Sequence, residues 1–516
     1  MSMSRAQGAG GGAQMESSRE ASSSAEIARP RQQPPAPRDL RSAPSTYDLI
    51  VLGGGTAGLV TASGCARLGR RVALIDRAAL GGDCLWTGCV PTKALVASAK
   101  LLHQMRHAEA FGLEAARPRV SPRAIMESMR ARRRDISRHD DPEKFRKLGI
   151  DVIEGAATLV AANVVEVDGR RLTAKDVVLA TGSRTAVPPV DGLEEHGYLD
   201  HASFLDRDDF PPSLLILGGG AIGIEFAQLF RRFGCDVVVV EMADEILNKE
   251  DADVVAAVRE ILRDEGVELR TGWAAKSVRV EEGKKVVRIE TASGQSAELR
   301  VDEVFVASGR RGNTEGLGLE TLGVKMNKSY VAVDKYLQTS VPRLWACGDV
   351  HGGLQFTHVA AYEAVKLVRN LLFPGKSAVD YEHVPWALYT DPEAAHIGMT
   401  EAEARAKVDG VRVYKVAMDD VDRAVVDRAA RGFVKLVCDT KGRILGAHAL
   451  CTHASTVIEE IVLARKKGMK IGELASLVSP YPSLADAVQK SASLYYQDVA
   501  GGWLGALARR VAKWSQ

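Results

Sequence analysis

Two cysteines in a glycine-rich stretch are the first residues of this chain whose type and spacing could carry chemistry. Cys84 and Cys89 stand in the sequence GGDCLWTGCVPTK, which begins at Gly81. In a regular helix five residues rise about 7.5 Å, which is too far for a comfortable disulfide. The glycines of this stretch allow the chain to bend so that Cys84 folds back towards Cys89. We therefore interpret the two as a redox pair. The alternative, two small buried hydrophobic residues, does not explain the glycines around them.

The residues after Cys89 favour a thiolate at that position. Pro91 suits the first turn of a helix, so Cys89 is predicted to lie at a helix N-terminus, where the helix dipole lowers the pKa of a thiol. Lys93 follows four residues later and lies on the same helical face, one turn on. The remaining cysteines lack such surroundings and are interpreted as buried and inert: Cys65, Cys235, Cys347, Cys438 and Cys451.

Two glycine-rich loops have the pattern of dinucleotide-binding sites. Each reads G-x-G-x-x-G directly after an apolar strand and opens a helix, so that its backbone can approach a pyrophosphate that the helix N-terminus stabilises. A carboxylate, Asp76 or Glu241, follows 18 residues after each last glycine, where it can accept hydrogen bonds from a ribose. We expect two bound dinucleotides, although a single such loop can also occur without a ligand. The motif glycines are Gly53, Gly55 and Gly58, and Gly218, Gly220 and Gly223.

Glu241 also indicates which nicotinamide cofactor binds. Its carboxylate would repel a 2′-phosphate, and no Arg occurs in the eight residues that follow it. NADH is therefore favoured over NADPH. Arg231 and Arg232, on the preceding predicted helix, are interpreted as a solvated face and not as phosphate-binding residues.

The elements that must position these residues occur in a repeated order. Two strand–glycine–helix–strand units predict two doubly wound α/β domains. Beyond about residue 384 the pattern changes to antiparallel strands followed by helices from about residues 455 and 471, which predicts a third, α+β domain. The predicted strands are residues 47–52, 71–75, 213–217, 236–240, 433–438 and 443–450, and the predicted helices of the repeated units are residues 57–68 and 222–233.

Length and composition agree with this organisation. A chain of 516 residues corresponds to about three domains. The 68 basic residues nearly balance the 66 acidic ones, which argues against a nucleic-acid binder held by charge. No stretch approaches 18 apolar residues, so no membrane span is expected. Seven cysteines in a chain of this length do not indicate a secreted disulfide scaffold. A cytoplasmic protein is predicted.

The two ends of the chain differ from the rest. Residues 1–45 are rich in Ser, Gly, Ala, Arg and Pro and are predicted to be a disordered extension. Residues 501–516 form an amphipathic pattern that could lie on an anionic membrane surface. Packing on the protein's own surface is the alternative. The apolar face comprises Trp503, Leu504, Leu507, Val511 and Trp514, and the basic face comprises Arg509, Arg510 and Lys513.

From about Tyr47 to Ala500 the ordered set of motifs resembles the class I pyridine nucleotide–disulfide oxidoreductases. Besides the glycine loops and the cysteine pair, it includes ATG at 180–182, ACGD at 346–349 and THVA at 357–360. The resemblance implies FAD in the first loop, NAD(P)H in the second, and a homodimer whose active sites are completed by the partner's C-terminal segment. The implied domains are FAD-binding at 46–195 and 313–383, NAD(P)H-binding at 196–312, and dimerisation at 384–500.

The resemblance also implies roles for single residues. Cys89 corresponds to the flavin-proximal thiol and Cys84 to the interchange thiol that meets the substrate, while Lys93 and Glu225 correspond to an ion pair beside the flavin N5. Asp349 would contact the flavin nucleotide, and the helix that opens near Thr357 and His358 would direct its N–H groups at the flavin. The further cofactor contacts implied are Gly82, Thr181, Gly182, Gly309 and Gly348.

One departure from the family pattern concerns the substrate. Members that act on dithiols carry a His before a Pro near the C-terminus, with a Glu five positions later. Here Tyr481 and Asp486 stand at those positions. A Tyr with a pKa near 10 is a poor base at neutral pH, whereas a His near 6.5 is a good one. Mercuric reductases resemble the chain here, because they also have a tyrosine after a Pro. They differ in carrying an N-terminal C-x-x-C domain and a C-terminal vicinal cysteine pair, and the last cysteine here is Cys451.

We therefore expect an FAD-dependent NAD(P)H oxidoreductase that passes electrons through Cys84 and Cys89 to a soft metal ion or a small oxidant. A soft metal would bind both cysteines transiently as thiolates, and no structural metal is expected. Two alternatives stay open. One is a dihydrolipoamide dehydrogenase-like enzyme that tolerates Tyr481, and the other is a non-catalytic flavoprotein that senses redox state. A further alternative is that Tyr481 lines the site and has no chemical role.

Overall fold

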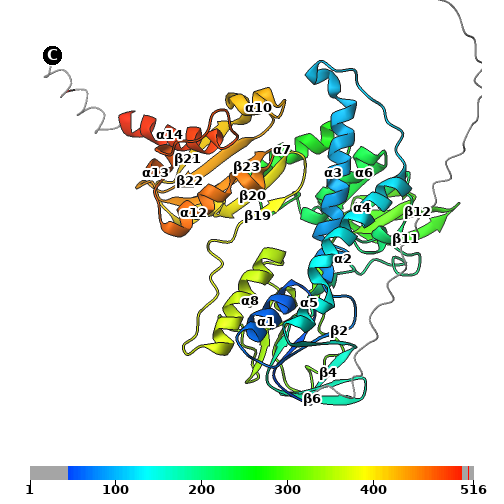
Figure 1. Ribbon diagram of the computed structural model, residues 1–516. Coiled ribbons are helices and arrows are strands. Elements are labelled where there is room, and N and C mark those ends of the chain that lie inside the picture. Colours follow the sequence, from blue (N-terminus) through cyan, green and yellow to red (C-terminus); the bar gives the residue numbers. More distant parts are fainter. Residues whose placement is uncertain (1–44, 502–509, 511–516) are drawn as a thin grey trace, which may run out of the picture. The chain divides into compact units, whose positions relative to one another are not determined.

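A computed structural model describes residues 45–501 and residue 510 (Figure 1). The extension and the tail expected at the two ends of the chain therefore lie outside the described residues, apart from Ser45, Gly501 and Arg510. Among the described helices, none combines the length and the apolar character needed to cross a bilayer.

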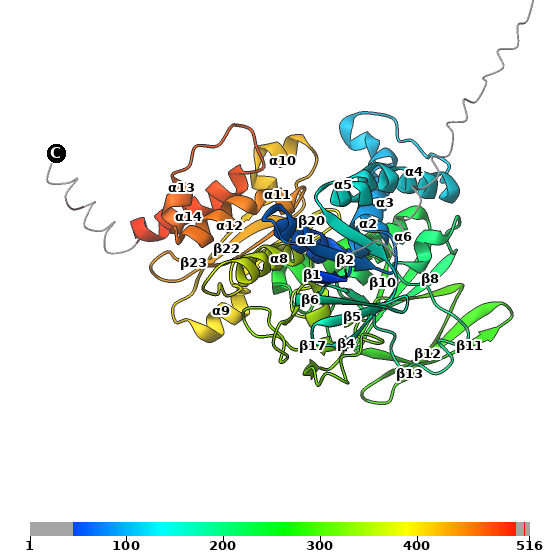
Figure 2. The same ribbon diagram turned by 60° about the horizontal axis from the view of Figure 1, so that its bottom comes forward.

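The first glycine loop belongs to a seven-stranded sheet with the order β3-β2-β1-β6-β5-β4, in which β18 also pairs with β6. The strands around β1 are parallel, and their central segments 49–52, 72–75 and 177–179 are apolar and buried, which is typical of a sheet covered on both faces. Helices α1 (Thr56–Arg67) and α8 (Thr357–Leu372) pack against each other in both views (Figures 1 and 2). The strands are β1 (Thr46–Leu52), β2 (Val72–Asp76), β3 (Ile150–Glu154), β4 (Ala157–Ala161), β5 (Val164–Val167), β6 (Arg170–Leu179) and β18 (Leu344–Ala346).

The second glycine loop belongs to a parallel sheet with the order β10-β9-β8-β14. An antiparallel sheet of β11, β12 and β13 follows it. The chain passes from the first unit to the second and later returns, and we call these two connecting segments the chain crossings. A small sheet of β7 and β15 pairs one crossing with the other. The elements are β7 (Ser183–Thr185), β8 (Ser213–Leu217), α6 (Ala221–Phe233), β9 (Asp236–Glu241), α7 (Ala252–Asp264), β10 (Glu268–Thr271), β11 (Trp273–Glu281), β12 (Lys284–Thr291), β13 (Ser296–Val301), β14 (Glu303–Val306) and β15 (Arg310–Gly312).

The third unit is a five-stranded antiparallel sheet with the order β19-β20-β23-β22-β21, covered by helices. The expected architecture, two α/β units that each contain one glycine loop and a third α+β unit, is confirmed. The elements are β19 (Trp386–Leu388), β20 (Glu393–Gly398), α9 (Glu401–Lys407), β21 (Arg412–Ala417), α10 (Asp422–Val426), β22 (Phe433–Cys438), β23 (Ile444–Cys451), α11 (Ala454–Val457), α12 (Glu459–Lys467), α13 (Ile471–Ala475) and α14 (Asp486–Gly501).

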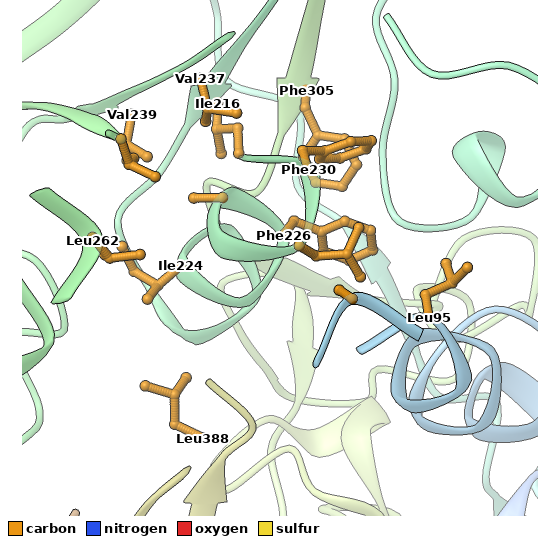
Figure 3. Close-up of a cluster of buried hydrophobic side chains, with 14 of the residues drawn as sticks. Leu95, Ile216, Ile224, Phe226, Phe230, Val237, Val239, Leu262, Phe305 and Leu388 are labelled. Atoms are coloured by element: carbon orange, nitrogen blue, oxygen red, sulfur yellow. The ribbon is translucent and has the colours of Figure 1, made fainter. Parts of the chain in front are cut away.

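Between β2 and β3 of the first unit the chain forms α2 (Gly82–Trp86), α3 (Cys89–Arg106), α4 (Pro122–Ser137) and α5 (Pro142–Lys147). Helix α3 packs on α6, and Figure 3 shows the core between them, where Leu95 faces the cluster of Phe226, Phe230 and Phe305. Burying these large side chains fixes α3 against the second glycine-loop unit. The site residues on α3 and α6 are thereby held together.

The interpretation of Arg232 as part of a solvated face is wrong. Its side chain is only 5% exposed, and its guanidinium binds Glu265 at 2.7 Å and Asp391 at 2.8 Å. Helix α6 is covered on this side by the end of α7 and by the start of the third unit, so the charge is buried and paired. Arg231 keeps a more exposed position and donates to Asp236.

Candidate active site

The chain folds back between the two cysteines as the glycines require. Gly81 and Gly82 have left-handed backbone angles, and a side chain at Gly82 would place its Cβ 2.7 Å from the Cα of Gly55. At the other end of the turn, the N–H of Gly88 donates to the carbonyl of Asp83 at 2.5 Å. Cys84 then lies in α2 and Cys89 is the first residue of α3, with a hydrogen bond between the two free thiols.

Cys89 is the more acidic of the pair. The hydrogen bond from Cys84 lowers the pKa of Cys89 to about 6 against the effect of burial, with help from Thr357, whose hydroxyl oxygen lies 3.3 Å from the sulfur, and from the charge of Lys93. The same hydrogen bond raises the pKa of Cys84. Burial raises the pKa of the other cysteines: to about 12 for Cys65, Cys235, Cys438 and Cys451, and above its usual range for Cys347.

Lys93 and Glu225 form an ion pair between α3 and α6. Nζ of Lys93 lies 2.6 Å from Oε2 of Glu225, and the other carboxylate oxygen accepts the N–H of Tyr389 at 2.8 Å. The Lys93 ammonium also lies 4.5 Å from the centre of the Tyr389 ring. Burial alone would lower the pKa of Lys93, but Glu225 more than reverses this effect. The pair brings one side chain from each dinucleotide-binding unit together.

The glycine loops have the shape that a pyrophosphate requires. A Cβ at Gly53 would lie 2.2 Å from the carbonyl oxygen of Ala180, and one at Gly58 would lie 1.8 Å from that of Gly53, so both are confined by backbone. By contrast, a Cβ at Gly55 would meet nothing closer than 3.7 Å, and one at Gly220 nothing within 4 Å. The middle glycine of each loop therefore faces open space, where a dinucleotide fits.

Two carboxylates clamp these loops from the ends of β2 and β9. Asp76 accepts the N–H groups of Gly54 and Ala78. Glu241 accepts that of Gly219 at 2.6 Å and that of Ala243 at 2.8 Å. A carboxylate has about four acceptor positions, so each keeps some for ribose hydroxyls. The two loops are thus built in the same way.

The remaining predicted cofactor contacts surround the first loop. Gly182, Gly309 and Gly348 all have left-handed backbone angles, and Thr181 exchanges hydrogen bonds with Asn313. Asp349 accepts the hydroxyl of Ser183 at 2.7 Å. Thr357 opens α8, whereas the exposed imidazole of His358 bonds the carbonyl of Pro385 at 2.8 Å.

A buried amide near this group was missed in the sequence. The Nε2 atom of Gln355, two residues before α8, is buried and has no hydrogen-bond partner among the described residues. A buried donor without a partner is costly. Together with the open glycine loop, it fits a bound FAD. Its isolated position in the sequence gives no spacing signal that could have identified it.

A charged cluster around Asp83 was also missed. Arg310 lies 2.6 Å from one oxygen of this carboxylate and Nε2 of His201 lies 3.1 Å from the other. Burial alone would raise the pKa of Asp83, but His201 and Arg310 hold it well below its usual range. Arg310 also lies 3.7 Å from Asp349. The residue before Cys84 is thus bound to both chain crossings between the dinucleotide-binding units.

Tyr481 and Asp486 differ in exposure and in their hydrogen-bond partners. The Tyr481 side chain is 75% exposed and donates its hydroxyl to Asp422 at 2.7 Å, which raises its pKa. Asp486 is only 9% exposed and accepts from Ser483 at the start of α14. Among the described residues no hydrogen bond joins Tyr481 to either redox cysteine, and no group of three His, Cys, Asp or Glu forms a metal site.

We expect Thr357→Val to raise the pKa of Cys89. Because that pKa is about 6, the thiolate is present above pH 6 and is lost as the pH falls through that value. Removing a hydrogen bond to a charged group costs about 1.5–3 kcal/mol, so the midpoint should rise by about one unit. The measurement is a pH titration of the long-wavelength thiolate–flavin absorption. Thr357→Ser keeps the hydroxyl and should titrate like the wild type, and an unchanged midpoint in Thr357→Val would contradict the assignment.

Comparison with protein families gives two matches that together span most of the described chain. Residues 47–364 match the model described as pyridine nucleotide-disulphide oxidoreductase. Residues 384–492 match the model of the dimerisation domain of the same family.

Individual proteins are similar to this chain over nearly their whole length. A mercuric reductase of Streptomyces lividans is 32% identical over 88% of this chain and 97% of its own. A dihydrolipoyl dehydrogenase of Zymomonas mobilis is 33% identical over 87% of this chain and 98% of its own. Among solved structures, the Cu(II) complex of the HOCl-induced flavoprotein disulfide reductase RclA of Escherichia coli is 30% identical with a TM-score of 0.78, covering 87% of this chain and 99% of that one.

Proposed function

This chain belongs to the pyridine nucleotide-disulphide oxidoreductases, FAD-dependent enzymes that use NAD(P)H, and we propose that it reduces a soft metal ion through Cys84 and Cys89 with electrons from NADH. The observation that carries the proposal is the state of Tyr481, which stands where a dithiol-specific enzyme places an imidazole. Its phenol is bound to Asp422, and its pKa is raised further above neutrality. It is a poor proton acceptor at pH 7.

The proposed acceptor removes the need for that base. A leaving thiolate must be protonated when a disulfide substrate is reduced, whereas a soft metal ion bound to two thiolates takes up an electron pair directly. In this step Cys84 and Cys89 lose two electrons and form an S–S bond, and a divalent metal ion such as Hg(II) becomes the neutral atom. The protons of the thiols are released when the metal binds, not in the electron transfer.

The other site residues have roles that follow from their contacts. FAD, when bound, accepts hydride from the nicotinamide and passes the electron pair to the disulfide. Thr357 and Lys93 stabilise negative charge on Cys89 through a hydrogen bond and a neighbouring positive charge. Glu225 holds the Lys93 ammonium on α3. Asp76 and Glu241 keep the glycine loops open for the two dinucleotides.

We further propose that Tyr481 acts in the partner's active site. A dimerisation domain is present, which supports a homodimer. Tyr481 is 75% exposed and the nearby Val478 is 95% exposed, so the segment before α14 presents apolar surface that a monomer leaves in water. A partner subunit would bury it.

Similar proteins support the acceptor class. Several relatives that are about 30% identical are mercuric reductases, and the RclA structure is a Cu(II) complex. Thiolates are the ligands that soft metal ions prefer. The Glu241 carboxylate favours NADH over NADPH as the donor.

An acceptor screen tests the proposal. Purified enzyme is supplied with NADH or NADPH and with Hg(II), Cu(II), lipoamide, glutathione disulfide or a quinone, and nicotinamide oxidation is followed. We expect metal-dependent turnover with NADH that exceeds lipoamide turnover by at least about tenfold. Faster lipoamide turnover would identify a dihydrolipoamide dehydrogenase-like enzyme. Absence of turnover with every acceptor would favour a non-catalytic redox sensor.

A further inference from the structure

Helix α8 begins without a polar cap. Its N-cap residue is Phe356, whose side chain has no atom that can accept a hydrogen bond from the first turn, although Ser, Thr, Asp or Asn is usual at this position. The next residue, Thr357, carries the hydroxyl that lies 3.3 Å from the Cys89 sulfur. The position of this hydroxyl therefore depends on contacts other than a cap.

The segment that enters the third unit supplies those contacts. The Phe356 ring stacks on the Trp386 ring, with their centres 6.2 Å apart and their planes inclined by 10°. Two residues further along the chain, Nε2 of His358 donates to the carbonyl of Pro385 at 2.8 Å. The rings of Phe356 and His358 also stack on each other at 5.3 Å. The residues on both sides of Thr357 are thus bound to two adjacent residues at the start of β19.

Trp386 is itself held by the other two units. Its indole N–H donates to the Glu250 carboxylate of the second unit at 2.7 Å, and its ring stacks at 3.8 Å on His396 of the third unit. The His396 side chain is only 2% exposed, and its Nδ1 lies 3.3 Å from the same Glu250 carboxylate. Its Nε2 donates to the carbonyl of Gly398. Since Phe356 belongs to the first unit, all three units meet at the Trp386 side chain.

A row of side chains across the third sheet extends this anchor. Lys435 and Lys415, in the last two positions of the row, bind Asp251 at 2.8 Å and Asp253 at 3.1 Å. Both carboxylates lie at the start of α7, directly after Glu250. Because both ends of the row are bound to this short stretch, the position of Trp386 is fixed relative to the second unit. The row contains one residue from each strand, paired in register: Trp386, His396, His448, Lys435 and Lys415.

We propose that Trp386 is a positioning residue for the redox pair, which holds Phe356 and thereby keeps the Thr357 hydroxyl within hydrogen-bond distance of the Cys89 sulfur. Hydrogen bonds weaken steeply when their distance and angle depart from the favourable range. A small displacement of the start of α8 would therefore remove much of the stabilisation of the Cys89 thiolate. The inference goes beyond the proposed function, because it concerns the thiolate and holds for any electron acceptor.

The first test is a pH titration of the thiolate–flavin absorption in the reduced holoenzyme. Alkylation of Cys89 by iodoacetamide as a function of pH, followed by mass spectrometry, is a second readout. Trp386→Leu removes the ring that Phe356 packs on, and we expect the midpoint to rise by about 0.5–1 unit. Trp386→Phe keeps a ring between Phe356 and His396 and loses only the bond to Glu250, so its midpoint should stay within about 0.2 unit of the wild type.

The deciding comparison uses Thr357→Val, which lacks the hydroxyl. If Trp386 acts through that hydroxyl, adding Trp386→Leu to Thr357→Val should move the midpoint by less than about 0.3 unit, because the effects of coupled residues do not add. Phe356→Leu removes the ring on the α8 side and should repeat both results, so it decides the matter if Trp386→Leu does not retain FAD. An unchanged midpoint in the Leu variants, or equal shifts with and without the hydroxyl, would overturn the proposal. Neither readout needs an acceptor, so failure of the acceptor screen would leave this test intact.

Discussion

Replacing Cys84 with Ser is expected to reduce acceptor-dependent NADH oxidation by about a thousandfold or more, because no second sulfur remains to complete the redox pair. Reduction of the flavin by NADH should persist, since the glycine loops and the Lys93–Glu225 pair are untouched. The long-wavelength absorption should also persist, because Thr357 and the charge of Lys93 still stabilise the Cys89 thiolate after the Cys84 thiol is removed.

Cys89→Ser should lose the same turnover but also lose the absorption, and this difference tests which sulfur is next to the flavin. The matched control is Cys451→Ala, because Cys451 is buried and its pKa is raised to about 12, so that it is not ionised at neutral pH. This variant should keep its turnover within about twofold. If Cys84→Ser lost the absorption and Cys89→Ser kept it, the roles of the two thiols would be reversed.

The second large effect is a gain of activity in Tyr481→His. An imidazole with a pKa near 6.5 can accept and return a proton at neutral pH, and general acid–base catalysis contributes about 10²–10⁴-fold. We expect lipoamide turnover to rise by about 10²-fold. Its pH profile should acquire a limb near pH 6.5 that the wild type lacks. Reduction of a metal ion should change by less than about threefold, because it requires no base at this position.

Tyr481→Phe is the control for this experiment. It removes the hydrogen bond to Asp422 without adding a base, so lipoamide turnover should stay at the wild-type level. A rise in Tyr481→Phe equal to that in Tyr481→His would mean that releasing Asp422, and not adding an imidazole, caused the gain. No gain in a folded, metal-active Tyr481→His would place this segment away from the partner's thiols.

Local patterns were enough to predict the parts of the site that depend on short stretches of chain. The glycine loops need only a buried strand, three glycines and a carboxylate 18 residues on, and all of these are neighbours in one strand–helix–strand unit. The helix start at Cys89 likewise follows from Pro91 and the preceding glycine. The strand at Ser213–Leu217 was predicted with its observed bounds for the same reason.

Long-range pairs could not be predicted in this way. Asp83 meets Arg310 across 227 positions and His201 across 118, and no repeat or periodicity links those positions. Arg232 was misassigned because its two ion-pair partners, Glu265 just after α7 and Asp391 in the third unit, are far from α6 in the sequence. The position of Tyr481 beside Asp422 depends on how α10 meets the segment before α14. Such contacts are fixed by tertiary packing and not by local propensity.

The contacts of Asp83 have a mechanical consequence. A rotation between two domains needs both connecting strands to twist freely, but here His201 on one crossing and Arg310 on the other are fastened to the same carboxylate. Turning the nicotinamide-binding unit as a rigid body would therefore pull on the residue that precedes Cys84. We therefore expect the nicotinamide to enter and leave by movements of loops and side chains more than by rotation of the whole unit.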